Sequence, residues 1–268
     1  AYRISPLGVG PFSFPKWAPF TLSFTVVTLR SGAPIDLCEL YTLRFNVKKE
    51  WTFKNNKYAS GDIVDYEFNE AKLEAKGLEF ESNGIWDPYE TYGDEAKEYF
   101  PDYIQEQYRE SYVFKDYSGY GFYKKDEDPV SDAVDLKERG DTERAYNILT
   151  KLLEDYPECI DALVHIGNMY LDPWFMPEHA LHCYKTAILI AEKNFPEKFD
   201  PVFLWGILEN RPYIRALHGL CIAYWRMKKF EESLSVAKKG LRINPPDNTG
   251  FRFILEELEK GREWREDF

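Results

Sequence analysis

The feature that most constrains this chain is a set of small residues that recur at fixed spacing in its second half. Ala133 and Gly167 are 34 residues apart, and Cys221 follows 54 residues later. A second small residue follows each of these at a nearly constant distance: Ala145, Ala180 and Ser233. Small residues let two helices approach closely, and the large residues one turn after the first set fill the space beside the contact: Leu136, Tyr170 and Tyr224. The spacing predicts consecutive helical hairpins over residues 126–268, with repeats that start near 126, 160 and 214.

These positions resemble those at which a tetratricopeptide repeat carries its packing residues, in a unit of 34. The first and third repeats end in proline at the expected place, at Pro157 and Pro245. The longer second step indicates an insertion of about twenty residues, roughly Asn194–Pro212. The stretch 251–268 reads as a capping helix over the last repeat, with these apolar residues: Phe253, Ile254, Leu255, Leu258 and Trp264.

A closer resemblance covers roughly residues 200–255. The segment 204–219, LWGILENRPYIRALHG, enters a helix through Glu-Asn-Arg-Pro, and the segment 244–252, NPPDNTGFR, leaves another through Asn-Pro-x-Asp-Asn. This block resembles the C-terminal segment of the suppressor of tumorigenicity seven family and of uncharacterised prokaryotic tetratricopeptide proteins. The resemblance implies a scaffold or adaptor and no particular reaction.

The first part of the chain has a different character. Residues 20–29 and 40–53 are rich in β-branched and aromatic residues, and each favours a strand. A shorter alternating run at 62–68 follows a turn signal at 54–57. We therefore expect an α+β fold, in which a small β-containing N-terminal domain (residues 1–85) precedes the all-α, tetratricopeptide-like array of helical hairpins (residues 126–268).

Residues 86–125 join these two parts and are acidic and rich in tyrosine. Residues 66–130 contain 17 acidic and 7 basic residues, and nine of the nineteen tyrosines lie at positions 89–123. Disordered linkers are usually poor in aromatic residues. Aromatic and aliphatic residues from Tyr99 to Tyr112 recur at roughly helical spacing, so we expect a helical connector with a tyrosine face that packs on the protein. An acidic, aromatic surface for a basic partner is the alternative.

Composition excludes several classes of protein. The net charge of −12 argues against a nucleic-acid footprint, which needs a basic surface. The apolar runs stop short of the ~20 residues of a membrane helix. The four cysteines have no close pair, which argues against a disulfide scaffold and favours a reducing, cytoplasmic location.

The block at residues 200–255 supplies most of the candidate partner-binding residues. We expect Asn168, Asn210, Arg211, Arg215 and His218 to lie on the concave face of the array and to hold an acidic or C-terminal group of a peptide. The structural alternative is that Glu209 and Asn210 cap a helix while an arginine pairs with a carboxylate to fix the insertion.

Catalytic and metal-binding interpretations have less support. All four histidines lie at positions 165–218, but His179-x-x-His182 matches no established zinc pattern. His218-x-x-Cys221 could suggest a nucleophile and its base, yet Cys221 occupies a packing position of the repeat. We therefore expect no cofactor and no metal, and we expect an adaptor that binds a protein or peptide partner. An enzyme with its site in the N-terminal domain and a self-associating subunit are the alternatives.

Overall fold

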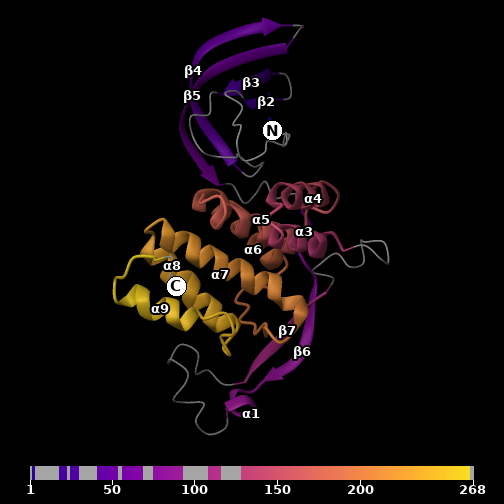
Figure 1. Cartoon of the computed structure of the whole chain (residues 1–268), viewed down its shortest axis with the longest axis vertical. Coiled ribbons are helices and arrows are strands. Elements are labelled where there is room, and N and C mark those ends of the chain that lie inside the picture. The colour runs from indigo at the N-terminus through magenta and orange to yellow at the C-terminus, as the bar shows by residue number, and fades with distance from the viewer. Residues whose placement is uncertain are drawn as a thin grey trace. The chain divides into compact units, whose positions relative to one another are not determined.

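The computed structural model of the chain describes residues 2–3, 18–22, 25–29, 41–53, 56–68, 75–92, 108–115 and 128–265. The chain divides into two compact units, Ala1–Glu74 and Ala75–Phe268. Strands make up the described part of the first unit, and helices dominate the second (Figure 1). The fold is therefore α+β.

The first unit contains a five-stranded sheet in the order β1-β2-β3-β5-β4. The strands are β1 (Tyr2–Arg3), β2 (Ala18–Leu22), β3 (Thr25–Leu29), β4 (Tyr41–Phe53) and β5 (Asn56–Phe68). The pairs β1/β2, β2/β3 and β4/β5 are antiparallel, and β3 pairs with β5 in parallel. The strand predicted over residues 40–53 is confirmed as β4, and the run at 62–68 forms the second half of β5.

The prediction of one strand over residues 20–29 is wrong. This run forms parts of two strands that pair with each other, with Ala18 opposite Leu29 and Leu22 opposite Thr25. Alternation of residue types indicates which side of a sheet each residue faces, but it does not indicate where the chain reverses.

A β-hairpin belongs to the second unit, although its strands fall in the predicted N-terminal domain and connector. Strand β6 (Phe80–Trp86) pairs antiparallel with β7 (Arg109–Phe114), and the short helix α1 (Pro88–Tyr92) lies between them in sequence. The prediction of a helical connector over residues 86–125 is thus wrong for residues 109–114, and its residues 93–107 and 116–125 lie outside the described part of the chain. Tyr112 and Phe114 are two residues apart, so the strand directs both rings to one side, where they contact other aromatic rings.

The helices are α3 (Pro129–Glu138), α4 (Thr142–Asp155), α5 (Ile160–Leu171), α6 (Pro177–Glu192), α7 (Arg211–Arg226), α8 (Phe230–Ile243) and α9 (Phe251–Glu259). Local sequence explains several of their ends. The Asp141 carboxylate accepts a hydrogen bond from the Arg144 amide at 3.3 Å, and Asp128 caps α3 in the same way through Ser131 at 3.0 Å. Helices α3, α6 and α7 each have a proline in the first turn. None of the helices in the described residues is both long and apolar enough to span a membrane.

The helices pack in consecutive pairs, α3 with α4, α5 with α6 and α7 with α8. The small residues that predicted these contacts are all buried: Ala133, Ala145, Gly167, Ala180, Cys221 and Ser233. In the last pair the Ser233 hydroxyl donates to the Cys221 carbonyl at 2.8 Å. Burial raises the pKa of the Cys221 thiol to about 12, which opposes formation of a nucleophilic thiolate.

Tyr184 of α6 lies between α5 and α7. A Cβ added at Gly167 would be 2.7 Å from the Tyr184 ring, and one added at Gly219 would be 2.3 Å from it. Both helices therefore need glycine where they meet this ring.

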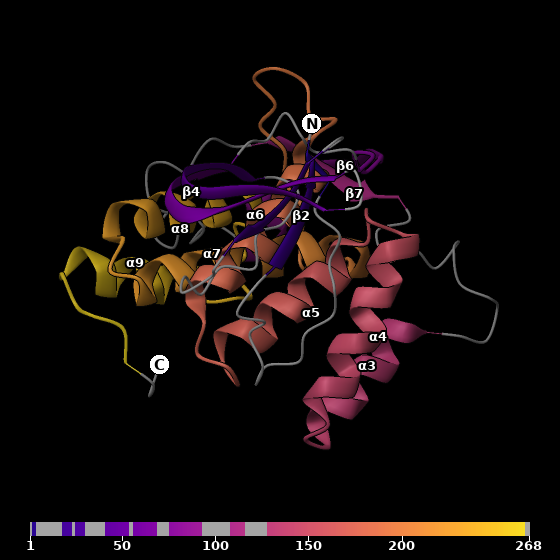
Figure 2. The same cartoon turned by 90° about the horizontal axis from the view of Figure 1, so that it is seen from above.

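The first helices of the pairs also pack on one another, because α5 contacts both α3 and α7. Figure 2 shows α5 between the α3/α4 pair and α7. Among the described helices, the second members α4, α6 and α8 pack mainly on first helices, although Lys239 of α8 forms an ion pair with Glu192 of α6 at 2.5 Å. The stack is therefore tighter on the side of α3, α5 and α7.

An aromatic cluster joins the β6–β7 hairpin to the helices. Its members are Phe80, Tyr112, Phe114, Phe195, Phe199, Phe203 and Tyr213. Phe114 stacks on Phe203 at 4.4 Å between ring centroids. Three of the phenylalanines come from the predicted insertion between α6 and α7, and Val202 of the same segment pairs with Ser111 of β7. The insertion is therefore a packing element.

Helix α9 covers the last pair, but it ends at Glu259, so the prediction of a capping helix over residues 251–268 is confirmed for 251–259 and wrong for 260–265. Phe251 is fully buried, and its ring fills the place where a Cβ at Gly240 would lie. The Asp247 carboxylate accepts hydrogen bonds from the Phe251 and Arg252 amides at 2.7 and 2.9 Å. The Asn-Pro-x-Asp-Asn motif, which follows α8, thus supplies through Asp247 a cap for the beginning of α9. Phe253, expected among the packing residues, is 71% exposed.

Candidate partner-binding face

One side of α5 and α7 carries residues at equivalent repeat positions, which we call the first-helix face. On α5 these are Asp161, His165, Asn168 and Asp172, and on α7 they are Arg215, Gly219, Ile222 and Arg226. Residues three or four positions apart share one side of a helix, so each set forms a continuous row.

Two ion pairs connect the rows. Arg215 Nη1 lies 3.5 Å from Asp161 Oδ1, and Arg226 Nη2 lies 2.8 Å from Asp172 Oδ1. Each pair joins positions 54 residues apart, which is the offset between the second and third repeats. Arg226 also donates through Nη1 to the Leu171 carbonyl at 2.6 Å, at the end of α5. These contacts fix α5 and α7 side by side.

Each of the two arginines also lies over a tryptophan from outside the two helices. The Arg215 guanidinium is 5.5 Å from the centre of the Trp205 ring, and that of Arg226 is 4.7 Å from the Trp264 ring. These are distances at which a cation and an aromatic face attract. The face therefore has two Asp–Arg–Trp groups, one near the beginning of α7 and one near its end.

His165 is part of the first group. Its Nε2 lies 3.7 Å from Asp161 Oδ1. Burial lowers the pKa of the imidazole and outweighs the opposing effect of Asp161, while Arg215 and Lys137 lower it further. The ring is therefore neutral at pH 7.

Two of the five predicted residues, Arg215 and Asn168, belong to the first-helix face. The Arg215 side chain is 37% exposed and can reach solvent. The Asn168 Oδ1 accepts a hydrogen bond from the Tyr184 hydroxyl at 2.6 Å, so this oxygen takes part in packing between α5 and α6.

The other three predicted residues serve the fold. Asn210 is fully buried: its Nδ2 donates to the Tyr112 and Leu204 carbonyls, and its Oδ1 accepts from the Phe114 amide at 3.2 Å. A fully buried amide is not available on the binding face. The structural alternative supposed that Asn210 caps α7, but its side chain makes no capping hydrogen bond to that helix.

Arg211 lies one turn before Arg215 on α7, and its guanidinium is 5.3 Å from the centre of the same Trp205 ring, whereas His218 packs against α9. Arg211 Nε donates to the Trp205 carbonyl at 3.0 Å and so contacts the backbone of the insertion. The pairing of an arginine with a carboxylate that the alternative expected is present at Arg215, which pairs with Asp161 of α5. The His218 ring packs edge-on against Phe251 at 5.5 Å, and burial lowers its pKa to about 4.

Sequence reasoning missed Asp161, Asp172, Arg226, Trp205 and Trp264. The repeat alignment contained a signal for the first three, because an offset of 54 residues places each aspartate beside an arginine. Nothing comparable marks the tryptophans, which come from segments outside the repeats.

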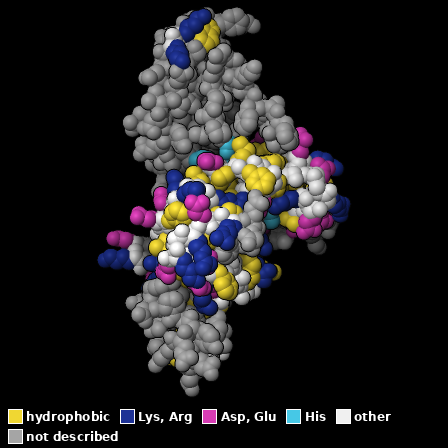
Figure 3. All heavy atoms as spheres, turned by 60° about the vertical axis from the view of Figure 1, so that its left-hand side comes forward, with side chains coloured by type: hydrophobic (Ala, Val, Ile, Leu, Met, Phe, Trp, Pro, Cys, Tyr) yellow, Lys and Arg dark blue, Asp and Glu magenta, His cyan; other side chains and the backbone are white. Residues whose placement is uncertain are grey.

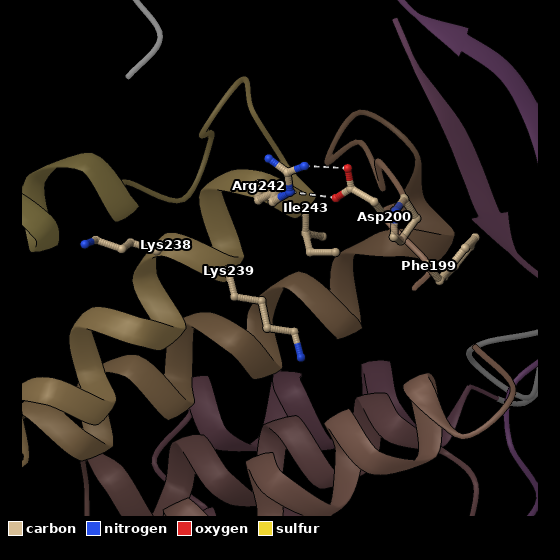
Figure 4. A pocket seen from close by; sticks show the side chains of 7 residues that line it. Phe199, Asp200, Lys238, Lys239, Arg242 and Ile243 are labelled. Atoms are coloured by element: carbon tan, nitrogen blue, oxygen red, sulfur yellow. Dashed lines mark hydrogen bonds and ion pairs between the residues drawn. The ribbon is translucent and has the colours of Figure 1, made fainter. Parts of the chain in front are cut away.

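A hollow of about 500 Å³ lies on the other side of the α7/α8 pair, between α8 and the insertion (Figure 4). Its lining residues are Phe199, Asp200, Pro201, Lys238, Lys239, Arg242 and Ile243. Asp200 forms a two-point ion pair with Arg242 at 2.7 and 2.6 Å and accepts from the buried Arg109 at 3.2 Å. Lys238 and Lys239 extend away from this pair in Figure 4. Asp200 and Arg242 therefore attach the insertion and β7 to α8, while Lys239 pairs with Glu192 of α6 at 2.5 Å.

Acidic and basic side chains alternate over the part of the helical unit visible in Figure 3, without one large area of a single sign. Among the described residues, no group of three or more His, Cys, Asp or Glu side chains is placed to hold a metal ion. His179 instead stacks near Tyr170, with ring centres 5.1 Å apart. Comparison of the sequence with models of known protein families gave no match, and neither did comparison with curated proteins.

Proposed function

We propose that the three helix pairs are tetratricopeptide-like units and that the chain is an adaptor that binds a protein or peptide segment on the first-helix face. The repeat spacing and the buried small residues support the first part. The observation that carries the second is the packing of α5 on both α3 and α7, because the second helices α4, α6 and α8 do not pack on one another to a comparable extent. Such packing curves a helical stack, with its first helices on the inner side.

Arg215 is the residue on this face best suited to a partner. It is partly exposed, it is held at a fixed position by Asp161, and its planar guanidinium can donate to a carboxylate. A partner with an acidic residue or a free C-terminal carboxylate matches this chemistry.

The test compares the proteins captured by the wild-type chain and by Arg215→Glu, identified by crosslinking and mass spectrometry. We expect Arg215→Glu to lose the captured partner. Lys151→Glu is the matched control, because it makes the same charge change at an exposed position on α4. It should leave capture unchanged.

A double variant separates binding from folding. Asp161→Arg with Arg215→Glu restores an ion pair between α5 and α7 in reversed orientation. If Arg215 contacts the partner, the double variant regains the wild-type melting temperature but not the partner. Capture that is unaffected by Arg215→Glu, or equally reduced by Lys151→Glu, would show that the first-helix face is not the binding surface.

A further inference from the structure

The segment Arg262–Arg265, which follows α9, lies against the end of α7. The chain turns at Gly261, which has a φ of +67°, and then continues without regular secondary structure. The Trp225 indole Nε1 donates to the Arg262 carbonyl at 2.8 Å. The segment therefore contacts the helix through its backbone as well as its side chains.

Two side chains of the segment complete the contact. The Trp264 ring meets the Trp225 ring edge-on at 5.2 Å between centroids, and the Arg226 guanidinium lies over Trp264. Glu263 forms an ion pair with Lys228 at 2.8 Å. The surface made by Trp225, Arg226 and Lys228, the Arg226 subsite, thus contacts a backbone carbonyl, a carboxylate and an indole in consecutive residues.

The Arg226 subsite is fixed before anything binds to it. Arg226 is held by the Leu171 carbonyl and Asp172, both at the end of α5. Trp225 precedes Arg226 on α7 and is 1% exposed with the segment in place. A preorganised surface loses little conformational entropy when a ligand arrives.

The two Asp–Arg–Trp groups differ in how their tryptophan is attached. Trp205 is bound through its own backbone, since its amide donates to Asn244 Oδ1 at 3.0 Å and its carbonyl accepts from Arg211. Trp264 lies in a segment whose Glu263–Lys228 pair is 64% exposed on both sides, and such exposed pairs contribute little. Arg262 is tied to Glu257 of α9 by a two-point ion pair at 2.8 and 2.7 Å, so the segment is anchored where it begins. Glu263 and Trp264 beyond this anchor contact the Arg226 subsite through the exposed ion pair and the ring contacts, which a competing indole can replace.

Building on the proposed function, we propose that the Arg226 subsite binds an extended peptide of a partner protein in which an acidic residue precedes a tryptophan. The segment Arg262–Arg265 occupies the subsite in the free protein and is displaced when the partner binds. The partner then continues along the first-helix face toward Arg215.

The test uses a fluorescently labelled peptide, Gly-Arg-Glu-Trp-Arg, which copies residues 261–265. Trp264→Ala in the full chain removes the competing indole. We expect this variant to bind the peptide about tenfold more tightly than the wild type, because a tethered competitor acts at high effective concentration. The peptide with alanine in place of tryptophan should not bind.

A charge exchange tests the subsite without disturbing a buried residue. Lys228→Glu in the Trp264→Ala chain should weaken binding of the Gly-Arg-Glu-Trp-Arg peptide severalfold, as expected for one exposed ion pair, and should bind Gly-Arg-Lys-Trp-Arg better than Gly-Arg-Glu-Trp-Arg. Lys151→Glu in the same background is the control and should retain the original preference.

Three results would overturn the proposal. The first is a Trp264→Ala chain that has wild-type helicity by circular dichroism but binds the peptide no better than the wild type. The second is binding that ignores the Lys228 charge. The third is a wild-type dimer in light scattering that Trp264→Ala dissociates, which would assign the subsite to a second copy of the chain. Because the peptide assay needs no natural partner, its failure is distinguishable from a failure of the Arg215 capture experiment.

Discussion

At the scale of single residues, Tyr184 determines how closely α5 and α7 can pack. Its ring is completely buried and touches Gly167 on one helix and Gly219 on the other. The ring cannot move away from one glycine without moving into the other helix. A methyl group at either glycine must therefore displace a backbone.

We predict that Gly219→Ala lowers the free energy of unfolding by about 1–3 kcal/mol, the usual cost of overpacking, even though alanine favours helix. Urea unfolding followed by circular dichroism measures this change. Gly206→Ala is the control, because a Cβ there meets no atom within 4 Å, and it should change stability by less than about 0.5 kcal/mol. Equal stabilities of Gly219→Ala and the wild type would contradict the packing described.

The repeat pattern identified Gly167 as a position that needs a small residue, but it did not identify Gly219. Gly167 occupies the small-residue position of its repeat, which Cys221 occupies in the next. Gly219 stands at the repeat position of His165, where nothing in the pattern demands a small residue. Only the place of the Tyr184 ring between the two helices explains it.

At the scale of elements, Asn210 fastens strand β7 to the helices. Its side chain satisfies the Phe114 amide and the Tyr112 carbonyl, two backbone groups on the β7 edge that does not face β6. A buried amide thus performs the role of a neighbouring strand at this edge. Without it, these groups would have no partner from α7.

We predict that Asn210→Ala costs on the order of 3 kcal/mol, because it leaves buried backbone groups unpaired. Native-state hydrogen exchange should show lost protection at the Phe114 amide. Asn147→Ala removes the same group from an exposed position on α4 and should have little effect. Unchanged protection at Phe114 in Asn210→Ala would mean that the aromatic cluster alone holds β7.

The errors in element prediction have a common physical cause. Helical spacing of tyrosines between residues 99 and 112 favoured a helix, yet residues 109–114 form β7 because Tyr112 and Phe114 pack with Phe199 and Phe203. These partners are nearly ninety residues away in sequence. Periodicity records only local arrangement, so it predicts helix pairs well and long-range strand packing poorly.

At the scale of the whole molecule, buried histidines connect stability to pH. Burial lowers the pKa of His218 to about 4 and that of His182 to about 3, whereas an exposed histidine titrates near 6.5. Below pH 6.5 the unfolded chain therefore binds protons that the folded chain does not. Stability consequently falls as the pH decreases from about 6.5 toward 4.

We predict that the His218 contribution alone lowers the free energy of unfolding by about 2 kcal/mol between pH 7 and pH 5. The measurement compares this pH-dependent loss in the wild type and in His218→Gln, where it should be smaller by that amount. Each protein serves as its own reference at pH 7, so any packing defect of the variant cancels. An identical loss in both proteins would show that His218 is protonated in the fold.

The helix pairs of the second unit could therefore be predicted from the sequence more completely than the residues of the candidate site. Asn210 and Arg211 stood out because they belong to a distinctive block, but the structure uses them to attach the insertion and β7. The residues that connect α5 and α7 are ordinary charged residues, and only their equal offsets in two repeats distinguish them. Their tryptophan partners depend on how the connecting segments fold back.

The Asp161–Arg215 and Asp172–Arg226 pairs limit how helix pairs can be added to this protein by duplication. Both acidic residues come from the second of the predicted repeats and both arginines from the third. A tandem copy of the second repeat would place carboxylate against carboxylate at two points, and a copy of the third would do the same with guanidinium groups. The modules are consequently not interchangeable, and simple duplication would not lengthen this array without new charges at the joint.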